Sequence, residues 1–188
     1  NYTVQTETGI FDAEVTGHFQ YTTADKSDYP TVGDWAALRT YDNMALIEKV
    51  LPRKSSFSRK QAGNETQEQV VAANIDYLCI VCGLDGGRNF NLRGIERYIA
   101  MTSDGGAKPV IILNKADLCG DQQGILHQAQ GIAQGIQVHM VSALTKEGIQ
   151  DMMSSFDPGS TIAFTGQSGV GKSSLINSLL GKEMLKTG

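Results

Sequence analysis

The sequence contains the run Gly166-Gln167-Ser168-Gly169-Val170-Gly171-Lys172-Ser173-Ser174, a glycine-rich loop between an apolar stretch at 161–164 and an amphipathic stretch at 174–180. The run matches the phosphate-loop pattern in full. Its glycines allow backbone N–H groups to turn toward a phosphate, and Lys172 adds a mobile ammonium group. Ser173 offers a hydroxyl to Mg²⁺ at the positive amino terminus of the following helix. The loop therefore predicts a nucleoside-triphosphate site, and a structural glycine turn is the alternative.

A second motif, Asn114-Lys115-Ala116-Asp117, directly follows an apolar stretch at 109–113. That stretch predicts a parallel strand, and open α/β sheets bind ligands beyond the carboxyl ends of such strands. The Asp117 carboxylate can accept two hydrogen bonds from guanine, one from N1–H and one from the exocyclic amine. Adenine lacks this donor pair, and such a site rejects an unmatched analogue by ~10⁴–10⁵-fold. The motif therefore predicts a site for GTP or GDP, with an ATP-using phosphate-loop enzyme as the alternative.

Both motifs resemble those of the GTPase superfamily. The resemblance assigns Asn114 to the purine edge and to support of the loop, and the aliphatic stem of Lys115 to the face of the base. Ser142-Ala143-Leu144, at the end of the next predicted strand, is similar to the short loop whose backbone N–H, here that of Ala143, contacts the guanine carbonyl. In ordinary GTPases the phosphate loop comes first, whereas here it comes last. A parallel sheet with surface termini tolerates circular permutation, so the same site can form from the reversed order.

Composition and charge limit the class of protein. Hydrophobic residues make up 40% of the chain, which suffices for a packed core, and the formal net charge is −4. Because this charge is not typical of nucleic-acid-binding proteins, any RNA contact is expected from a local patch. No apolar run reaches the ~20 residues that span a bilayer, and residues 1–7 lack the basic and apolar parts of a signal peptide. We expect a soluble, cytoplasmic protein without membrane contact.

The cysteines and histidines do not indicate a metal site. Cys79 and Cys82 lie three positions apart on a predicted strand, so their side chains point to opposite faces and cannot readily share a ligand. We expect both to be buried apolar residues, because no second cysteine pair follows. The three histidines lie far apart in sequence, without ligand-like spacing.

Residues 1–52 predict a small all-β barrel. Short strands are indicated at 9–15, 32–38 and 43–47, which are too few for a sandwich. Barrels of this size commonly bind oligonucleotides on one face. A structural cap on the next domain is the equal alternative.

Residues 53–70 predict a basic and polar linker. Its first part places basic residues around one aromatic ring, and these are the candidates for RNA contact: Arg53, Lys54, Phe57, Arg59 and Lys60. The basic side chains could follow a phosphate backbone while the Phe57 ring stacks on a base. A solvated linker is the alternative.

Residues 71–188 predict strands that alternate with helices, the pattern of a parallel sheet covered on both faces. Strands are expected at 75–82, 109–113, 138–141 and 161–164. Helices are expected from the Asn91 cap to Thr102, at 125–133 and at 149–156. The last is expected to face inward with Ile149, Met152, Met153 and Phe156. The fold class is therefore an α/β phosphate-loop domain with a partly parallel sheet, preceded by a small all-β barrel.

Three further segments carry a closer resemblance. They are Leu51-Pro52-Arg53-Lys54-Ser55-x-Phe57-x-Arg59, Ala73-Asn74-Ile75-Asp76 and Phe90-Asn91-Leu92-x-x-Ile95-x-Arg97-Tyr98. With the reversed motif order and the N-terminal barrel, they resemble the ribosome small-subunit-dependent GTPase A family. The resemblance implies an OB-fold domain at 1–52, a linker, and a circularly permuted GTPase domain at 71–188. It also implies GTP hydrolysis stimulated by the small ribosomal subunit, and late maturation of that subunit through rRNA contacts.

The sequence departs from the family pattern at its end. After Gly181 only residues 182–188 remain, so we expect the switch threonine, the Asp-x-x-Gly loop and a C-terminal zinc domain to lie outside it. Asp117-Leu118-Cys119-Gly120 fits Asp-x-x-Gly by letter but already belongs to the base motif. The catalytic group is therefore unassigned, and catalysis by these residues alone is not expected. Zn²⁺ is expected only in the missing domain, and the protein is expected to be a monomer.

The alternative class of function is an RNA-binding module in which nucleotide only sets the conformation.

Overall fold

A computed structural model describes residues 1–42, 44–61, 64–86 and 89–186, with only the backbone described at 59–61 and 64–68. The chain forms two compact units, Asn1–Asn74 and Ile75–Gly188. The segment predicted as a linker therefore belongs to the first unit. Each unit has its own sheet and core.

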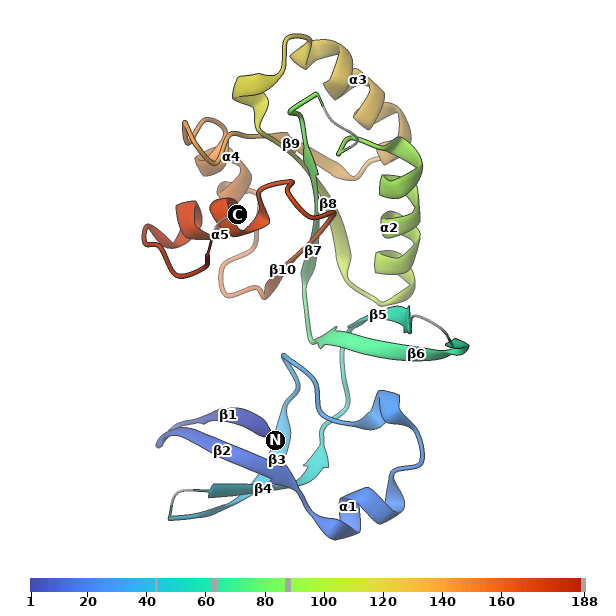
Figure 1. Ribbon diagram of the computed structural model, residues 1–188, viewed down its shortest axis with the longest axis vertical. Coiled ribbons are helices and arrows are strands. Elements are labelled where there is room, and N and C mark those ends of the chain that lie inside the picture. The colour runs from blue at the N-terminus through green and yellow to red at the C-terminus, as the bar shows by residue number, and fades with distance from the viewer. Residues whose placement is uncertain (43, 62–63, 87–88, 187–188) are drawn as a thin grey trace. The chain divides into compact units, whose positions relative to one another are not determined.

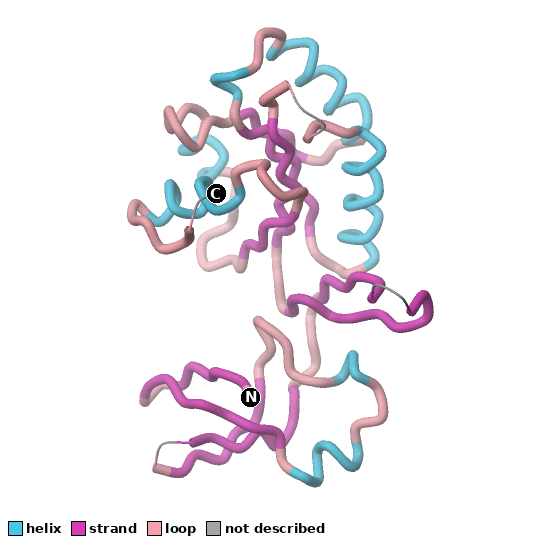
Figure 2. Tube along the Cα trace, viewed as in Figure 1, coloured by secondary structure: helices cyan, strands magenta, loops and turns pink. Residues whose placement is uncertain are grey.

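The described residues of the first unit form a four-stranded sheet, two short helices and a hairpin (Figure 2). In chain order its elements are β1 (Tyr2–Thr6), β2 (Gly9–Val15), α1 (Gly17–Thr22), the 3-10 helix η1 (Lys26–Asp28), β3 (Ala36–Tyr41) and β4 (Met44–Val50). The strand order is β1-β2-β4-β3, with β2 and β4 parallel and the outer pairs antiparallel. Ala13 and Ala45 lie opposite each other on β2 and β4, where both are buried together with Ile47. Their small side chains suit the centre of this thin core.

The predicted OB-fold barrel is not confirmed. The four described strands pair in an open row, and no pairing between β1 and β3 is found among the residues described. The strand expected at 32–38 begins only at Ala36. Residues before it form a turn, because Asp34 Oδ2 accepts from the Thr31 N–H at 2.8 Å and Gly33 has a φ of 90°. Polar turn chemistry thus replaces the first half of the expected strand.

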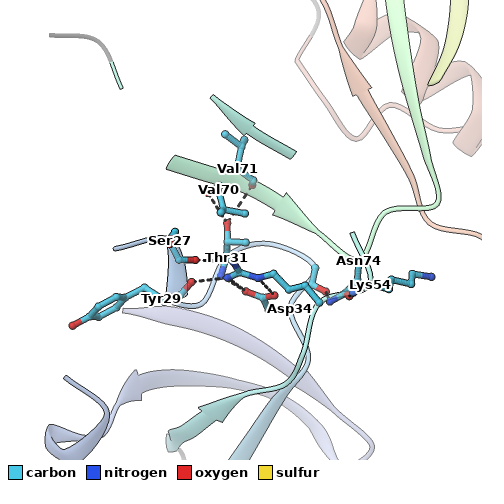
Figure 3. A network of polar contacts seen from close by, with 10 residues as sticks. Ser27, Tyr29, Thr31, Asp34, Lys54, Val70, Val71 and Asn74 are labelled. Atoms are coloured by element: carbon cyan, nitrogen blue, oxygen red, sulfur yellow. Dashed lines mark hydrogen bonds and ion pairs between the residues drawn. The ribbon is translucent and has the colours of Figure 1, made fainter. Parts of the chain in front are cut away.

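Residues 56–61 and 64–73 pair as an antiparallel hairpin in place of the predicted linker. It consists of β5 (Ser56–Gln61) and β6 (Asn64–Ala73). Its base is attached to the preceding turn: the Ala73 N–H donates to the Val32 oxygen at 2.9 Å, and the Thr31 hydroxyl contacts the oxygens of Val70 and Val71 (Figure 3). The polar sequence of the hairpin gives no apolar alternation, and so the strand signal on which prediction depends is weak.

The second unit is a parallel sheet covered by helices. Its elements are β7 (Tyr77–Gly83), α2 (Leu92–Asp104), β8 (Lys108–Asn114), the 3-10 helix η2 (Ala116–Leu118), α3 (Gln122–Ala133), β9 (Gln137–Met140), α4 (Ile149–Ser154), β10 (Ile162–Thr165) and α5 (Lys172–Leu180). The strand order is β10-β7-β8-β9, so the last described strand pairs with the first of this unit. Figure 1 shows α2 and α3 on one face of the sheet and α4 and α5 on the other. The predicted parallel sheet with helices on both faces is confirmed.

Strand β7 lies between the two hydrophobic cores of this unit, one on each face of the sheet, and it is buried along its whole length. Cys79 packs in the core under α4 and α5, whereas Cys82 packs in the core under α2 and α3. Burial raises the pKa of Cys79 to about 12 and that of Cys82 to about 11. Both are thus buried, as predicted, and their raised pKa values disfavour the thiolate. Of the four residues predicted to face inward around α4, Met152 and Phe156 are buried and Ile149 packs against the core, although Phe156 lies beyond the end of the helix. The prediction was wrong for Met153, which is 40% exposed.

Candidate nucleotide site

Three predicted motifs lie at the carboxyl edge of the parallel sheet. The phosphate loop follows β10, Asn114 ends β8, and Ser142 lies just after β9. Asn114 is almost fully buried and joins all three: its Nδ2 donates to the Val170 oxygen at 2.9 Å, and its Oδ1 accepts from the Ala143 N–H at 3.1 Å. One side chain therefore fixes the phosphate loop against the base motifs.

The phosphate loop requires glycine at two of its positions. Gly166 and Gly171 have φ values of 143° and 89°. A Cβ at Gly166 would stand 2.3 Å from the Val81 oxygen, and one at Gly171 would stand 2.4 Å from Asn114 Nδ2. The loop thus passes too close to the sheet and to Asn114 for any side chain. Val170 anchors the loop in the core, while residues 167–169 are exposed.

Lys172 begins α5 and reaches back over its own loop. Its Nζ donates to the Gly166 oxygen at 3.0 Å and to the Gln167 oxygen at 2.6 Å, and burial lowers its pKa. Ser173 and Ser174 follow in the first turn and are half-buried. The first backbone N–H groups of a helix have no intrahelical partner, so this end favours a phosphate. The arrangement suits an anion held by backbone N–H groups and one ammonium.

Asp117 is held by Ser142, whose hydroxyl donates to Asp117 Oδ1 at 2.5 Å. Ser142 is fully buried, and its Oγ also accepts from the Thr145 N–H at 3.1 Å. The carboxylate therefore has a fixed direction, which bidentate recognition of a base requires. The N–H of Ala143, which the sequence assigned to the guanine carbonyl, donates to Asn114 here. Of the remaining residues in the two base motifs, Ala116 is buried and Leu144 is 83% exposed.

Lys115 has a left-handed backbone with a φ of 65°, and its ammonium contacts Asp85 at 2.5 Å. Asn89 Nδ2 also donates to Asp85 Oδ1, at 3.2 Å. The hydrogen bond from Lys115, and to a lesser degree that from Asn89, lowers the pKa of Asp85. Sequence reasoning missed Asp85 and Asn89. Their position just after β7, at the same sheet edge as the other motifs, was the available signal.

The predicted RNA-contact residues do not form one exposed patch. The Arg53 guanidinium donates to both Asp34 oxygens at 2.8 Å, and to the oxygens of Ser27 at 2.6 Å and Tyr29 at 2.9 Å; the partners are labelled in Figure 3. Phe57 is buried, so its ring is not presented to a base. Lys54 is exposed. Arg59 and Lys60 lie on β5, and their side chains are outside the described part of the structure.

The described residues contain neither a membrane-spanning helix nor a cluster of metal-ligating side chains. No described helix combines the length and apolar character needed to cross a bilayer. Within the same residues, no group of three or more His, Cys, Asp or Glu side chains is placed to hold a metal ion.

The sequence matches the family described as RsgA GTPase over residues 50–188. A protein of Oceanobacillus iheyensis named small ribosomal subunit biogenesis GTPase RsgA 1 is 38% identical over 189 residues, covering 100% of this chain and 53% of the relative. The protein of Lactiplantibacillus plantarum named small ribosomal subunit biogenesis GTPase RsgA 2 is 41% identical over 187 residues, covering 99% and 52%. The chain thus spans about half the length of these relatives.

Two solved structures share the fold. YjeQ from Thermotoga maritima superposes with a TM-score of 0.72 at 24% identity, over 99% of this chain and 62% of that chain. YloQ, described as a circularly permuted GTPase, gives a TM-score of 0.64 at 21% identity, over 94% and 59%. The sheet order, with β10 beside β7, is the arrangement that a reversed motif order requires.

Proposed function

The chain belongs to the RsgA GTPase family, and from this premise we propose that it binds GTP and GDP, hydrolyses GTP and assists biogenesis of the small ribosomal subunit. One observation carries the nucleotide assignment: the two hydrogen bonds of Asn114 tie the phosphate loop to the base motifs. A ligand that fills both parts must carry phosphates at one end and a hydrogen-bonding base at the other. A guanine nucleotide has this form.

Each motif has a distinct role in the proposed complex. The loop 166–171 surrounds the β-phosphate with backbone N–H groups, and Lys172 leaves its loop carbonyls to contact the β- and γ-phosphates. Asp117 accepts from guanine N1–H and the exocyclic amine, held in direction by Ser142. Nucleotide binding therefore exchanges hydrogen bonds of Lys172 to neutral carbonyls for stronger ones to charged oxygens.

Mg²⁺ would reach the site together with the phosphates. Ser173 lies in the first turn of α5, next to the proposed phosphate position, and its hydroxyl is the hard oxygen ligand that Mg²⁺ prefers. Mg²⁺ usually keeps several waters and takes other ligands from phosphate oxygens, so one protein ligand is consistent with the residues present. When bound, the ion would neutralise charge on the β- and γ-phosphates.

The ribosomal part of the proposal is supported by the family and by the names of the relatives. We propose the small subunit and its rRNA as partners of a cytoplasmic monomer, and keep Lys54, Arg59 and Lys60 as candidates for RNA contact. Arg53 and Phe57 are no longer candidates for RNA contact, because Arg53 is bonded within its unit and Phe57 is buried. No residue of the site is assigned to activation of the attacking water.

Titration with fluorescent GDP and fluorescent ADP, with and without Mg²⁺, tests the nucleotide assignment. We expect a preference for GDP of at least about 10³-fold, since adenine lacks the donor pair that the Asp117 carboxylate would accept from guanine. Equal affinity would refute guanine recognition. Hydrolysis of GTP by the purified protein is then compared with and without small ribosomal subunits. If the subunits neither bind nor stimulate turnover, the ribosomal part fails while the nucleotide part stands.

A further inference from the structure

The loop that follows β7 carries an ion pair that none of the motifs includes. The carboxylate of Asp85 contacts the ammonium of Lys115, and their side chains are 23% and 27% exposed. The Asn89 amide donates to both oxygens of the same carboxylate, at 3.2 and 3.4 Å. Asp85 is therefore held from two sides, and it holds the end of the longest side chain in the base motif.

The course of the Lys115 side chain places it beside the phosphate loop. Its Cε stands 3.8 Å from the point that a Cβ at Gly171 would occupy. In sequence, Lys115 stands between Asn114, which is bonded to the loop, and the Asp117 carboxylate. The stem therefore borders the space between the phosphate loop and Asp117. A nucleoside bound at both ends must cross this space.

Asn89 connects the same loop to the floor of the site. Its Cβ stands 3.4 Å from the point that a Cβ at Gly83 would occupy, and Val170 Cα stands 3.3 Å from that point. The Asn89 side chain thus lies over the end of β7, close to the phosphate loop, while its amide holds Asp85. The carboxylate is therefore supported by the sheet edge as well as by its own loop.

We propose that Asp85 is a positioning residue for the purine base, acting through Lys115. A lysine side chain loses rotamer freedom when it is fixed, so an untethered Lys115 would have to be ordered by the nucleotide itself. Asp85 orders the ammonium beforehand, which keeps the aliphatic stem extended as an apolar surface along one face of the base. The inference rests on the proposed function, because it assumes that a guanine nucleotide occupies the site.

A double-mutant cycle tests this role. We expect Asp85→Asn to raise the Kd for fluorescent GDP about fivefold, the scale of a partly exposed ion pair. Asp104→Asn, which removes the same charge at an exposed position at the end of α2, should leave the Kd unchanged. In a Lys115→Met background, which keeps an unbranched stem without the ammonium, Asp85→Asn should have no further effect. Asp85→Glu should restore part of the affinity.

The outcomes separate this inference from the proposed function. Unchanged Kd in Asp85→Asn, with normal GDP binding by the wild type, would overturn the positioning role alone. Equal weakening in both backgrounds would also overturn it, because Asp85 would then act without Lys115. A wild type that does not bind GDP would overturn the inference together with the function on which it rests.

A measurement on the wild type covers the case in which Asp85→Asn does not fold. Lysine acetylation is followed by mass spectrometry with and without GDP. We expect GDP to slow acetylation of Lys115 severalfold and to leave Lys108 unchanged, since Lys108 is 72% exposed at the amino end of β8, the opposite edge of the sheet. Equal rates at Lys115 with and without GDP would show that the base does not cover the stem.

Discussion

The Asn114 amide donates to the Val170 oxygen at 2.9 Å, which joins two residues 56 positions apart in the chain. Both are buried, Asn114 to 1% exposure and Val170 completely. The bond connects the end of β8 to the phosphate loop after β10, although β7 lies between these strands in the sheet. The two halves of the site are thus linked by a side chain as well as by the sheet.

Asn114→Ala should therefore damage both the fold and the site. It removes the partner of the Val170 oxygen and of the Ala143 N–H, and an unsatisfied buried polar group costs about 1–3 kcal/mol. We expect a loss of about 2–3 kcal/mol in the free energy of unfolding, measured with urea. The affinities for GDP and for GTP should fall by the same factor. The control Gln128→Ala, on the exposed surface of α3, should change the free energy of unfolding by less than ~0.5 kcal/mol.

Two glycines of the phosphate loop allow backbone strain and steric overlap to be separated. Gly169 and Gly171 have similar φ values, 82° and 89°, but a Cβ at Gly169 meets nothing within 4 Å. Gly169→Ala should cost only the left-handed conformation, roughly 1–2 kcal/mol. Gly171→Ala should cost more and abolish GDP binding, because its methyl group would displace the Asn114 amide. Equal stability and equal binding of the two variants would contradict the close approach of Asn114.

Asp117→Asn should weaken GDP binding by about 100-fold, because a charge-assisted acceptor pair is lost. The variant amide can donate where the carboxylate accepted. Xanthosine diphosphate, whose base carries an oxygen in place of the exocyclic amine, should therefore bind the variant better than GDP does. The structure supports retention of the side-chain position, since Asn Oδ1 can still accept from Ser142. Titration of the wild type and the variant with both nucleotides tests this prediction. An unchanged affinity of the variant for GDP would show that Asp117 does not contact the base.

The second unit could be predicted almost completely from its sequence, whereas the first could not. Buried parallel strands such as β7 and β8 appear as continuous apolar runs, and the Asn91 cap marks the start of α2. The β5–β6 hairpin has no such pattern. Asp85 was missed because no short motif contains it: its partner Lys115 is 30 positions away, and only the sheet brings them together.

The sequence predicts that Arg53 contacts RNA, whereas in the structure its guanidinium forms an ion pair with Asp34. Its partner Asp34 has a side chain that is only 2% exposed, so removing the guanidinium leaves a buried carboxylate without an opposite charge. We expect Arg53→Ala to lower the free energy of unfolding by about 3 kcal/mol. Lys54→Ala, one position further along and exposed, should change it by less than about 0.5 kcal/mol.

For RNA binding, we expect Lys54→Ala to have a larger effect than Arg53→Ala, the reverse of their effects on the free energy of unfolding. The affinity for a single-stranded RNA oligonucleotide is measured between 50 and 200 mM salt, a range in which each phosphate contact contributes about 0.7 to the slope of log K against log salt. Lys54→Ala should reduce that slope by about 0.7, because one ammonium is lost from the interface. Arg53→Ala, measured at a temperature at which it remains folded, should keep the wild-type slope, since its guanidinium is already bonded to Asp34. A reduced slope in Arg53→Ala with no change in Lys54→Ala would reverse the two roles and return Arg53 to the RNA surface.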